Sequence, residues 1–204
     1  MSRILYLYGG WPGHTPYGVA DWTRGLLDEL GLANEVTESN DIFALDADLT
    51  GYDLIILGWN NALTTEDLTE AQERSLLGAV QSGTGVVAWH GAAAAFRSSL
   101  QYNFMLGGTF LEHPGGEAYP QSYKVTIVDQ DHEITSGVSS FEVASEQYYM
   151  AVDPNVHVLA TTTFSGEHLS WLAGHTCPVA WAREWGNGRV FYHSIGHFIS
   201  DLEE

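Results

Sequence analysis

Histidine is the residue type whose number and placement could do chemistry in this chain. There are nine histidines against seven lysines and arginines together. An imidazole titrates near neutral pH, so it can act as an acid or a base, and its neutral form binds divalent metals. Any single histidine is more often a hydrogen-bonded structural residue, so it is the gathering near predicted strand ends that favours a site. The five histidines placed in this way are His14, His90, His113, His132 and His197.

His90 has the clearest local context. Residues 85–89 form an apolar run that predicts a short buried strand, His90 and Gly91 predict a sharp turn, and residues 92–95 begin a predicted helix. Ligands of open α/β sheets bind at the carboxyl ends of the strands, so we expect His90 to face a pocket. Several enzymes place a serine or cysteine nucleophile on such an elbow. An imidazole there favours acid–base or ligand-holding chemistry over acyl transfer.

Three weaker signals accompany the histidines. Glu146 has aromatic neighbours and could be a desolvated acid or base, although a solvated loop glutamate fits the pattern equally well. His193 and His197 have the spacing of a helical metal pair, but a predicted strand precedes them and Gly196 lies between them. Four tryptophans could stack on sugar rings or fill the core. They are Trp11, Trp59, Trp89 and Trp171.

Composition excludes several classes of function. The formal charge is −19 with Lys124 as the one lysine, which argues against binding to nucleic acids and anionic membranes. The single cysteine, Cys177, excludes an intramolecular disulfide and a cysteine zinc cluster, and its context predicts a buried structural thiol. No signal segment is visible, and no apolar run approaches the roughly 20 residues that span a bilayer. We therefore predict a cytoplasmic protein.

Strands and helices alternate in the first half of the chain, which predicts a mainly parallel sheet within one domain over residues 1–204. The second half is less regular and contains long loops rich in His, Gly and Tyr. The predicted strands are 3–8, 34–38, 52–57, 85–89, 124–128, 156–162, 178–182 and 189–193, the last two as a hairpin, and the predicted helices are 21–30 and from Thr64 or Thr65 to about residue 80.

A series of motifs, in order along nearly the whole chain, resembles one family. The motifs are the glycine-rich loop that ends at His14, the strand 52–56, the segment 83–90, Gly107 to Phe110 with His113, residues 131–137, Glu146 with Tyr148, and the segment 178–197. In their order and coverage they resemble the ThuA-like (trehalose-utilisation) proteins, whose fold is that of the class I glutamine amidotransferases. The sequence departs from the family pattern at Glu133, where proline is usual, at Ser145, where aspartate is usual, and at His193.

The resemblance implies a three-layer, flavodoxin-like α/β fold and a role in sugar metabolism, often beside a partner oxidoreductase that makes 3-keto sugars. It does not imply amidotransferase chemistry, because His90 stands at the elbow where the wider superfamily carries its cysteine nucleophile.

We therefore expect a protein that acts on a sugar or keto-sugar glycoside. His90, His113 and Glu146 would be the acid–base groups. His14 and His197 would hold substrate hydroxyls or a divalent metal, whose presence the sequence leaves open, and Trp89 and Tyr148 would contact substrate. A non-catalytic carbohydrate- or partner-binding domain and a metal-dependent hydrolase are the alternatives, and apolar helix faces leave a homo-oligomer open.

Overall fold

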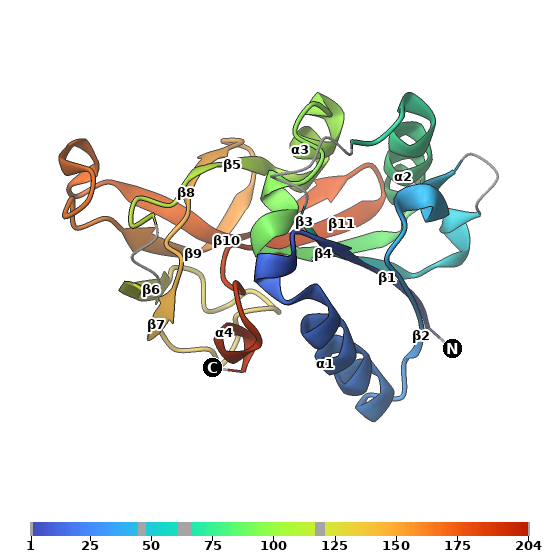
Figure 1. Cartoon of the computed structure of the whole chain (residues 1–204), viewed down its shortest axis with the longest axis horizontal. Coiled ribbons are helices and arrows are strands. Elements are labelled where there is room, and N and C mark those ends of the chain that lie inside the picture. Colours follow the sequence, from blue (N-terminus) through green and yellow to red (C-terminus); the bar gives the residue numbers. More distant parts are fainter. Residues whose placement is uncertain (1, 45–47, 61–66, 117–120, 204) are drawn as a thin grey trace.

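The computed structural model describes residues 2–44, 48–60, 67–116 and 121–203. Within these ranges nine strands form one sheet in the order β2-β1-β3-β4-β11-β10-β9-β6-β7, and β5 and β8 form a small separate sheet (Figure 1). The strands are β1 Arg3–Gly10, β2 Ala33–Thr37, β3 Leu54–Asn60, β4 Gly85–Trp89, β5 Gly108–Glu112, β6 Gln121–Ile127, β7 Phe141–Ser145, β8 Tyr149–Val152, β9 His157–Thr163, β10 Thr176–Trp185 and β11 Gly188–His193.

The sheet has two halves of different character. β2, β1, β3, β4 and β11 are parallel to one another, as expected for strands that alternate with helices. From β11 onward each neighbouring pair is antiparallel: β11–β10, β10–β9, β9–β6 and β6–β7. The sheet is therefore mixed, and the expectation of a mainly parallel sheet is wrong for the second half. Connections there return directly as hairpins, without the crossover helices that a parallel pair needs.

The helices lie on both faces of the sheet, with α1 and α4 on one side and α2 and α3 on the other (Figure 1). Alternate residues of β1 explain why both faces are covered. Leu5 and Leu7 belong to the core cluster that contains Leu76 of α2, whereas Tyr6 packs with Leu27 of α1. A strand buried on both faces must be apolar over its buried length, as residues 4–7 of β1 and residues 55–57 of β3 are. The helices are α1 Pro16–Glu29, α2 Glu70–Ser82, α3 Leu100–Leu106 and α4 Ile199–Leu202.

Several predicted bounds are confirmed or shifted. The strand predicted at 85–89 is β4, and the predicted hairpin is β10 and β11. The helix predicted from residue 21 begins at Pro16, a residue suited to the first helical position. The caps predicted at Thr64 or Thr65 lie outside the described residues, and α2 begins after a capping box formed by Thr69 and Gln72. Cys177 is buried, as predicted.

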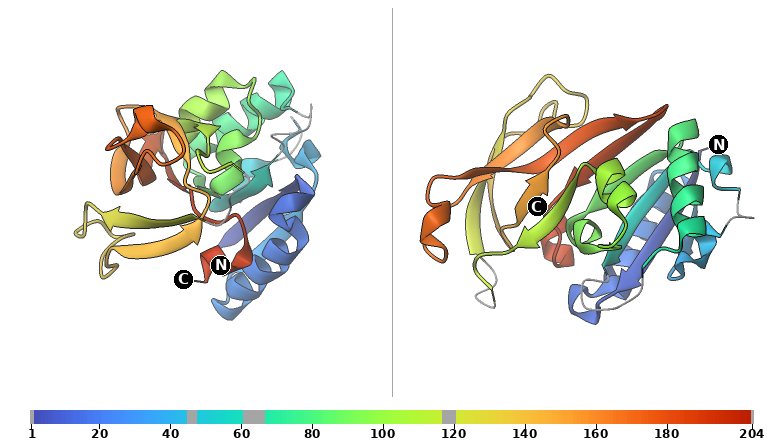
Figure 2. Two further views of the ribbon diagram at one scale, coloured as in Figure 1. Left: turned by 60° about the vertical axis from the view of Figure 1, so that its left-hand side comes forward. Right: turned by 90° about the horizontal axis from the view of Figure 1, so that it is seen from above.

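The β6–β7 hairpin departs from the line of the main sheet. β6 pairs with β9 only where Thr126 and Ile127 face Thr161 and Ala160, and the hairpin then turns away from the β9–β10 ribbon (Figure 2). The carboxyl end of β7 is thereby brought towards the middle of the molecule, where α4 packs against β7. This bend places the residue that follows β7 beside residues that follow the parallel strands.

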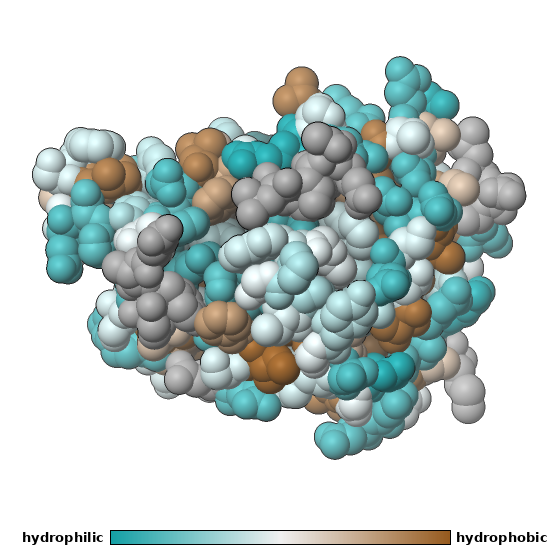
Figure 3. Space-filling view, in the orientation of Figure 1, coloured by the Kyte–Doolittle hydropathy of each residue, from teal (hydrophilic) through white to brown (hydrophobic). Residues whose placement is uncertain are grey.

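The outer surface reflects the composition. Hydrophilic residues cover most of the face seen in Figure 3, and apolar residues are scattered among them. Among the described residues no helix is both long enough and apolar enough to cross a membrane.

Candidate active site

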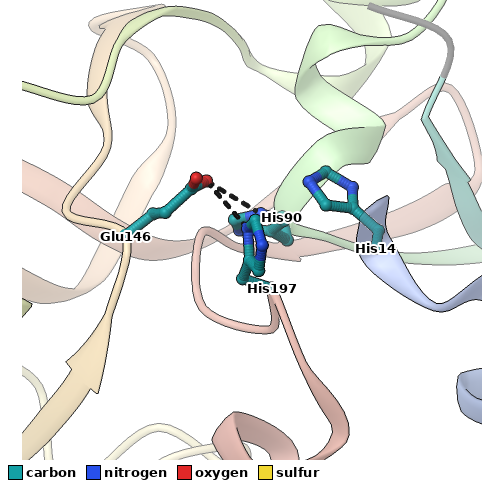
Figure 4. A group of neighbouring side chains, drawn as sticks. All are labelled: His14, His90, Glu146 and His197. Carbon is teal, nitrogen blue, oxygen red and sulfur yellow. Dashed lines mark ion pairs between the residues drawn. The ribbon is translucent and has the colours of Figure 1, made fainter. Parts of the chain in front are cut away.

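Four side chains from distant parts of the sequence meet at one place: His14, His90, Glu146 and His197, the His/Glu group. One nitrogen or carboxylate oxygen from each lies within 4.8 Å of the corresponding atoms of the other three. His90, Glu146 and His197 are buried or nearly so, and His14 is half-buried. In Figure 4 Glu146 approaches His90 and His197 from one side and His14 lies on the other.

Strand direction explains why these four meet. His14 follows β1, His90 follows β4 and His197 follows β11, which are parallel strands. Glu146 follows β7. Four successive antiparallel pairings lead from β11 to β7, and because that number is even, β7 runs in the same direction as β11. All four residues therefore leave the carboxyl ends of strands that point the same way, which is the edge where ligands of α/β sheets bind.

The backbone at His90 is an elbow that only a few residue types adopt readily. Its φ is +44°, in the left-handed region, and the 3-10 helix His90–Ala94 follows directly. A non-glycine residue in this region typically costs about 1–3 kcal/mol, and such strain gathers at functional sites. The hydroxyl of Tyr192 donates to the backbone carbonyl of His90 at 2.8 Å and helps to hold the turn.

The contacts of the His90 ring define its tautomer. Nδ1 lies 2.9 Å from the backbone carbonyl oxygen of Ser194, an acceptor only, so Nδ1 carries a proton. In the neutral imidazole Nε2 therefore offers a lone pair. The hydroxyl of Tyr148 lies 3.0 Å from Nε2 and can donate to it. Burial, followed by the neighbouring tyrosine and carboxylate charges, raises the pKa of Tyr148 well above its ordinary value, so its hydroxyl keeps its proton.

His14 reaches the group on a loop that requires glycine. At Gly10, φ is +87° and a Cβ would lie 1.6 Å from the carbonyl oxygen of Asn60. The Asn60 side-chain amide in turn lies 2.7 Å from Nδ1 of His14 and orients its ring. Burial, and then the charges of His90 and His197, lower the pKa of His14 to about 2, so this imidazole is neutral at physiological pH.

Glu146 is the acidic member of the group. Its Oε2 lies 3.3 Å from Nε2 of His90 and 3.1 Å from Nδ1 of His197. Burial alone would raise its pKa, but hydrogen bonds and charge interactions with the two histidines outweigh burial and hold the pKa well below the usual range. Glu146 is therefore a buried carboxylate that stays ionised.

Asp201 is a supporting residue that the sequence did not single out. Its Oδ2 accepts a hydrogen bond from Ser145 Oγ at 2.6 Å and another from the backbone N–H of His197 at 3.0 Å. Asp201 thus ties the residue next to Glu146 to the backbone of His197. No local pattern in the sequence pointed to this contact, because Ser145 and Asp201 are 56 residues apart.

The family can be decided by comparison with known proteins. A family model described as ThuA, trehalose utilisation, matches residues 3–204. The chain belongs to the ThuA family. Two ThuA-like proteins of known structure, from Parabacteroides merdae ATCC 43184 and Bacteroides uniformis ATCC 8492, are both 20% identical to it with a TM-score of 0.74. They cover 96% and 100% of this chain, which spans 80% and 84% of theirs.

A more distant likeness supports the fold of the wider superfamily. A glutamine amidotransferase from Thermotoga maritima matches 95% of this chain and 74% of its own length, with 11% identity and a TM-score of 0.58. No protein with a curated description matches the chain. In this ThuA protein the elbow carries His90, and the one cysteine, Cys177, lies elsewhere, buried on β10 with its thiol 3.9 Å from the carbonyl of Met150.

The remaining residues predicted for the site lie around the His/Glu group in this ThuA protein. Tyr148 contacts His90 directly. His113 lies at the margin: its ring stacks on Phe110 at 5.8 Å, and its charge contributes to the lowered pKa of His14. Its buried Nδ1 has no hydrogen-bond partner among the described residues. Trp89 lies on the α1 side of the sheet, with its ring 5.8 Å from that of Tyr6.

Two further histidines lie apart from the His/Glu group, and only for His132 was the opposite expected. His132 does not join the others, because it follows β6, and β6 runs antiparallel to the strands that carry the group. It lines a cavity of about 830 Å³ at the opposite edge, together with Asp53 and Gly85 beside the amino ends of β3 and β4. His193 does not pair with His197; its ring stacks against Trp89 at 6.4 Å. Burial, and then the His90 charge, lower the pKa of His193 to about 4.

Proposed function

We propose that this ThuA protein is an enzyme of sugar metabolism that acts on a sugar or keto-sugar glycoside by proton transfer at the His/Glu group. The observation that carries the proposal is the position of Nε2 of His90, which lies 3.0 Å from the Tyr148 hydroxyl and 3.3 Å from the Glu146 carboxylate. Abstraction of a proton beside a carbonyl uses a base and a hydrogen-bond donor, and a buried carboxylate stabilises the protonated base. The family's link to trehalose utilisation supports a carbohydrate as the substrate.

The roles follow from the protonation states. A carbonyl group on a sugar ring acidifies the neighbouring C–H, and Nε2 of His90 takes that proton while its electron pair moves towards the carbonyl oxygen. The protonated Tyr148 can donate a hydrogen bond to the oxygen as charge develops on it. Glu146 Oε2 lies 3.3 Å from this same nitrogen, so it accepts a hydrogen bond from the imidazolium that forms and stabilises its charge. Return of the proton at the other carbon gives isomerisation, and loss of the glycosidic group gives elimination.

The other residues of the site would hold the sugar. His14 and His197 offer ring nitrogens to substrate hydroxyls, and His113 stays a candidate for a second acid–base group because its Nδ1 is buried and without a partner among the described residues. Trp89 stays a proposed substrate contact, although its ring lies on the α1 side of the sheet. An oxidoreductase that forms a 3-keto sugar would supply the substrate, and we place the protein in the cytoplasm.

Hydrogen exchange tests the proposal most directly. The purified chain is incubated with a 3-keto disaccharide in D₂O, and NMR follows deuterium uptake beside the carbonyl and the appearance of product. We expect exchange with the wild-type chain and with His157→Ala, whose histidine is exposed at the opposite edge, and loss of exchange with His90→Ala. A wild-type chain that causes neither exchange nor conversion would refute the enzyme. Calorimetric binding of the sugar without conversion would support a carbohydrate-binding domain instead.

A further inference from the structure

We infer that the His/Glu group is a binding site for one divalent transition-metal ion, with His14, His90, His197 and Glu146 as its four protein ligands. The inference deepens the proposed function, because it concerns the same site and rests on that function for what the ion would do. The ligand atoms already lie within 4.8 Å of one another. An ion with metal–ligand bonds of about 2.1 Å holds neighbouring ligands about 3.0–3.4 Å apart, from octahedral to tetrahedral geometry, so the group must contract by an ångström or more.

The first argument is the arrangement of lone pairs around the centre of the group. Nδ1 of His90 donates to the Ser194 carbonyl, so Nε2 is the one ring nitrogen left to bind a proton or a cation, and it faces Glu146 Oε2 at 3.3 Å. A carboxylate oxygen and an imidazole lone pair repel each other unless a proton or a cation lies between them. A divalent cation bound by Glu146 Oε2 and His90 Nε2 would remove this repulsion.

The second argument is the set of outer contacts. Histidine ligands of metals usually donate their other ring N–H to a carbonyl, a carboxylate or an equivalent acceptor, which fixes the ring. His90 does this through Ser194. The His14 ring is fixed differently: the amide nitrogen of Asn60 donates to Nδ1 at 2.7 Å, and the amide oxygen in its place would accept from Nδ1 and leave Nε2 for the ion. Asp201 holds the backbone of His197. Asn60 itself is closely packed, because a Cβ at Gly91 would lie 2.5 Å from its side chain.

The donor atoms select the class of metal. Three imidazole nitrogens and one carboxylate oxygen suit Zn²⁺, Mn²⁺, Fe²⁺ and similar ions, whereas Mg²⁺ and Ca²⁺ prefer sites made of oxygen. Four protein ligands leave one or two positions of a five- or six-coordinate ion open for oxygen atoms of the substrate. An ion in this place would polarise a sugar carbonyl; with Nε2 of His90 bound to the ion, another group such as His113 would take the proton.

The exposed histidine at the other edge provides a matched control. His157 Nε2 lies 2.7 Å from Asp129 Oδ2, so it is also a histidine paired with a carboxylate, but its side chain is 56% exposed. The test uses the full chain, freed of metal with a chelator and dialysed. Calorimetry then measures the binding of Zn²⁺, Mn²⁺ and Mg²⁺ to the wild type, Glu146→Gln, His197→Asn and His157→Asn, and circular dichroism checks that each variant is folded.

We expect one equivalent of Zn²⁺ or Mn²⁺ to bind to the wild type and to His157→Asn with equal affinity, and binding to weaken by about 100-fold or more in Glu146→Gln and His197→Asn. The melting temperature of the wild type should rise on metal binding and that of the two ligand variants should not. Equal binding by Glu146→Gln and the wild type, no binding to the wild type, or a preference for Mg²⁺ would each overturn the inference.

Activity measured on the same samples separates this inference from the proposed function. Full hydrogen exchange by the metal-free chain would leave the enzyme standing and refute the metal as part of it. Stoichiometric metal bound by a chain that exchanges and converts no sugar would leave the metal site standing and refute the enzyme.

Discussion

The molecule carries two groups of histidines with a carboxylate, at opposite edges of one sheet, and they differ in what surrounds them. In the His/Glu group the carboxylate is Glu146, whose side chain is 11% exposed. In the surface group, which consists of Asp129, His132 and His157, the side chain of His157 is 56% exposed and that of Asp129 is 28% exposed. The ring centroids of His132 and His157 lie 5.2 Å apart, so distance alone does not distinguish the two groups.

The difference lies in how the side chains are held. Backbone N–H groups of the local turn, at Asp131 and His132, donate to Asp129, and these contacts together with His157 lower the pKa of the Asp129 carboxyl. In the His/Glu group the supports come from other elements: Ser194, Asn60 and Asp201. Water and salt screen a charge pair at the surface, whereas burial strengthens one. Histidines and carboxylates become a site when distant elements hold them out of water.

Removing the carboxylate from each group gives the largest contrast. Glu146→Gln should lower kcat for the keto-sugar reaction by about 10²–10⁴-fold, because the imidazolium of His90 loses the anion that stabilises it. Asp129→Asn should leave kcat and KM unchanged. Steady-state kinetics on the two purified variants, with melting curves to show that both are folded, make the comparison. Equal activity in Glu146→Gln and the wild type would remove Glu146 from the reaction.

Asp201 supports the His/Glu group without belonging to it, so its loss should affect stability as well as the site. Asp201→Ala leaves Ser145 Oγ and the backbone N–H of His197 without their buried acceptor. We expect the free energy of unfolding to fall by about 2–4 kcal/mol in urea titrations. Asp201→Asn keeps one acceptor oxygen and should recover part of both stability and kcat. Retention of full stability by the alanine variant would show that these hydrogen bonds contribute little.

The sequence singled out the residues of the His/Glu group, but it could not show which strand-end histidines lie at the same edge of the sheet. Local patterns place His14, His90 and His197 after strands, and those three strands are parallel. His132 also follows a strand, but whether that strand is parallel depends on which neighbour it pairs with. That pairing is decided by contacts between residues that are far apart in the sequence. β6 pairs with β7 and β9 as an antiparallel strand and so carries His132 to the other edge.

The elements of the fold show the same limit. Residues 85–89 were predictable because their apolar run is bounded by glycine on one side and by the His90 turn on the other. β5, β7 and β8 were not predicted, since each is short, lacks a continuous apolar run such as that of β4, and exists through pairing with a partner strand. Asp201 was not predictable as a supporting residue, because its role depends on Ser145, 56 residues away.

Close packing around the His/Glu group can be tested without changing a charge. Gly91→Ala would place a Cβ 2.5 Å from the side chain of Asn60, which orients His14. We expect a loss of about 1–3 kcal/mol in stability from the forced displacement. Metal affinity should fall with it, because Asn60 would move away from the His14 ring. An alanine at Gly78 of α2, where a Cβ would meet nothing within 4 Å, is the control and should cost nothing.

Buried and exposed histidines should also differ in their response to pH. The pKa of His193 is lowered to about 4 by burial first and then by the His90 charge, against about 6.5 in an unfolded chain. Below pH 6.5 the unfolded state binds the proton and the folded state does not. Stability is therefore lost as the pH falls from about 6.5 to about 4, by at most about 1.4 kcal/mol per pH unit for this residue. Urea titrations of the wild type and His193→Phe at pH 7, 6 and 5 should show a shallower decline in the variant, and parallel declines would contradict the assignment.

The smallest effect is expected where the comparison began, at the exposed pair. His157→Asn removes the 2.7 Å contact with Asp129, but both groups are in water and salt already screens their attraction. The urea midpoint should therefore change little at low salt and not at all at high salt, with metal stoichiometry and kcat unchanged. If His157→Asn instead lost activity to the extent of Glu146→Gln, the cavity of about 830 Å³ that His157 lines would be the better candidate for the active site, and burial would not be what separates the two groups.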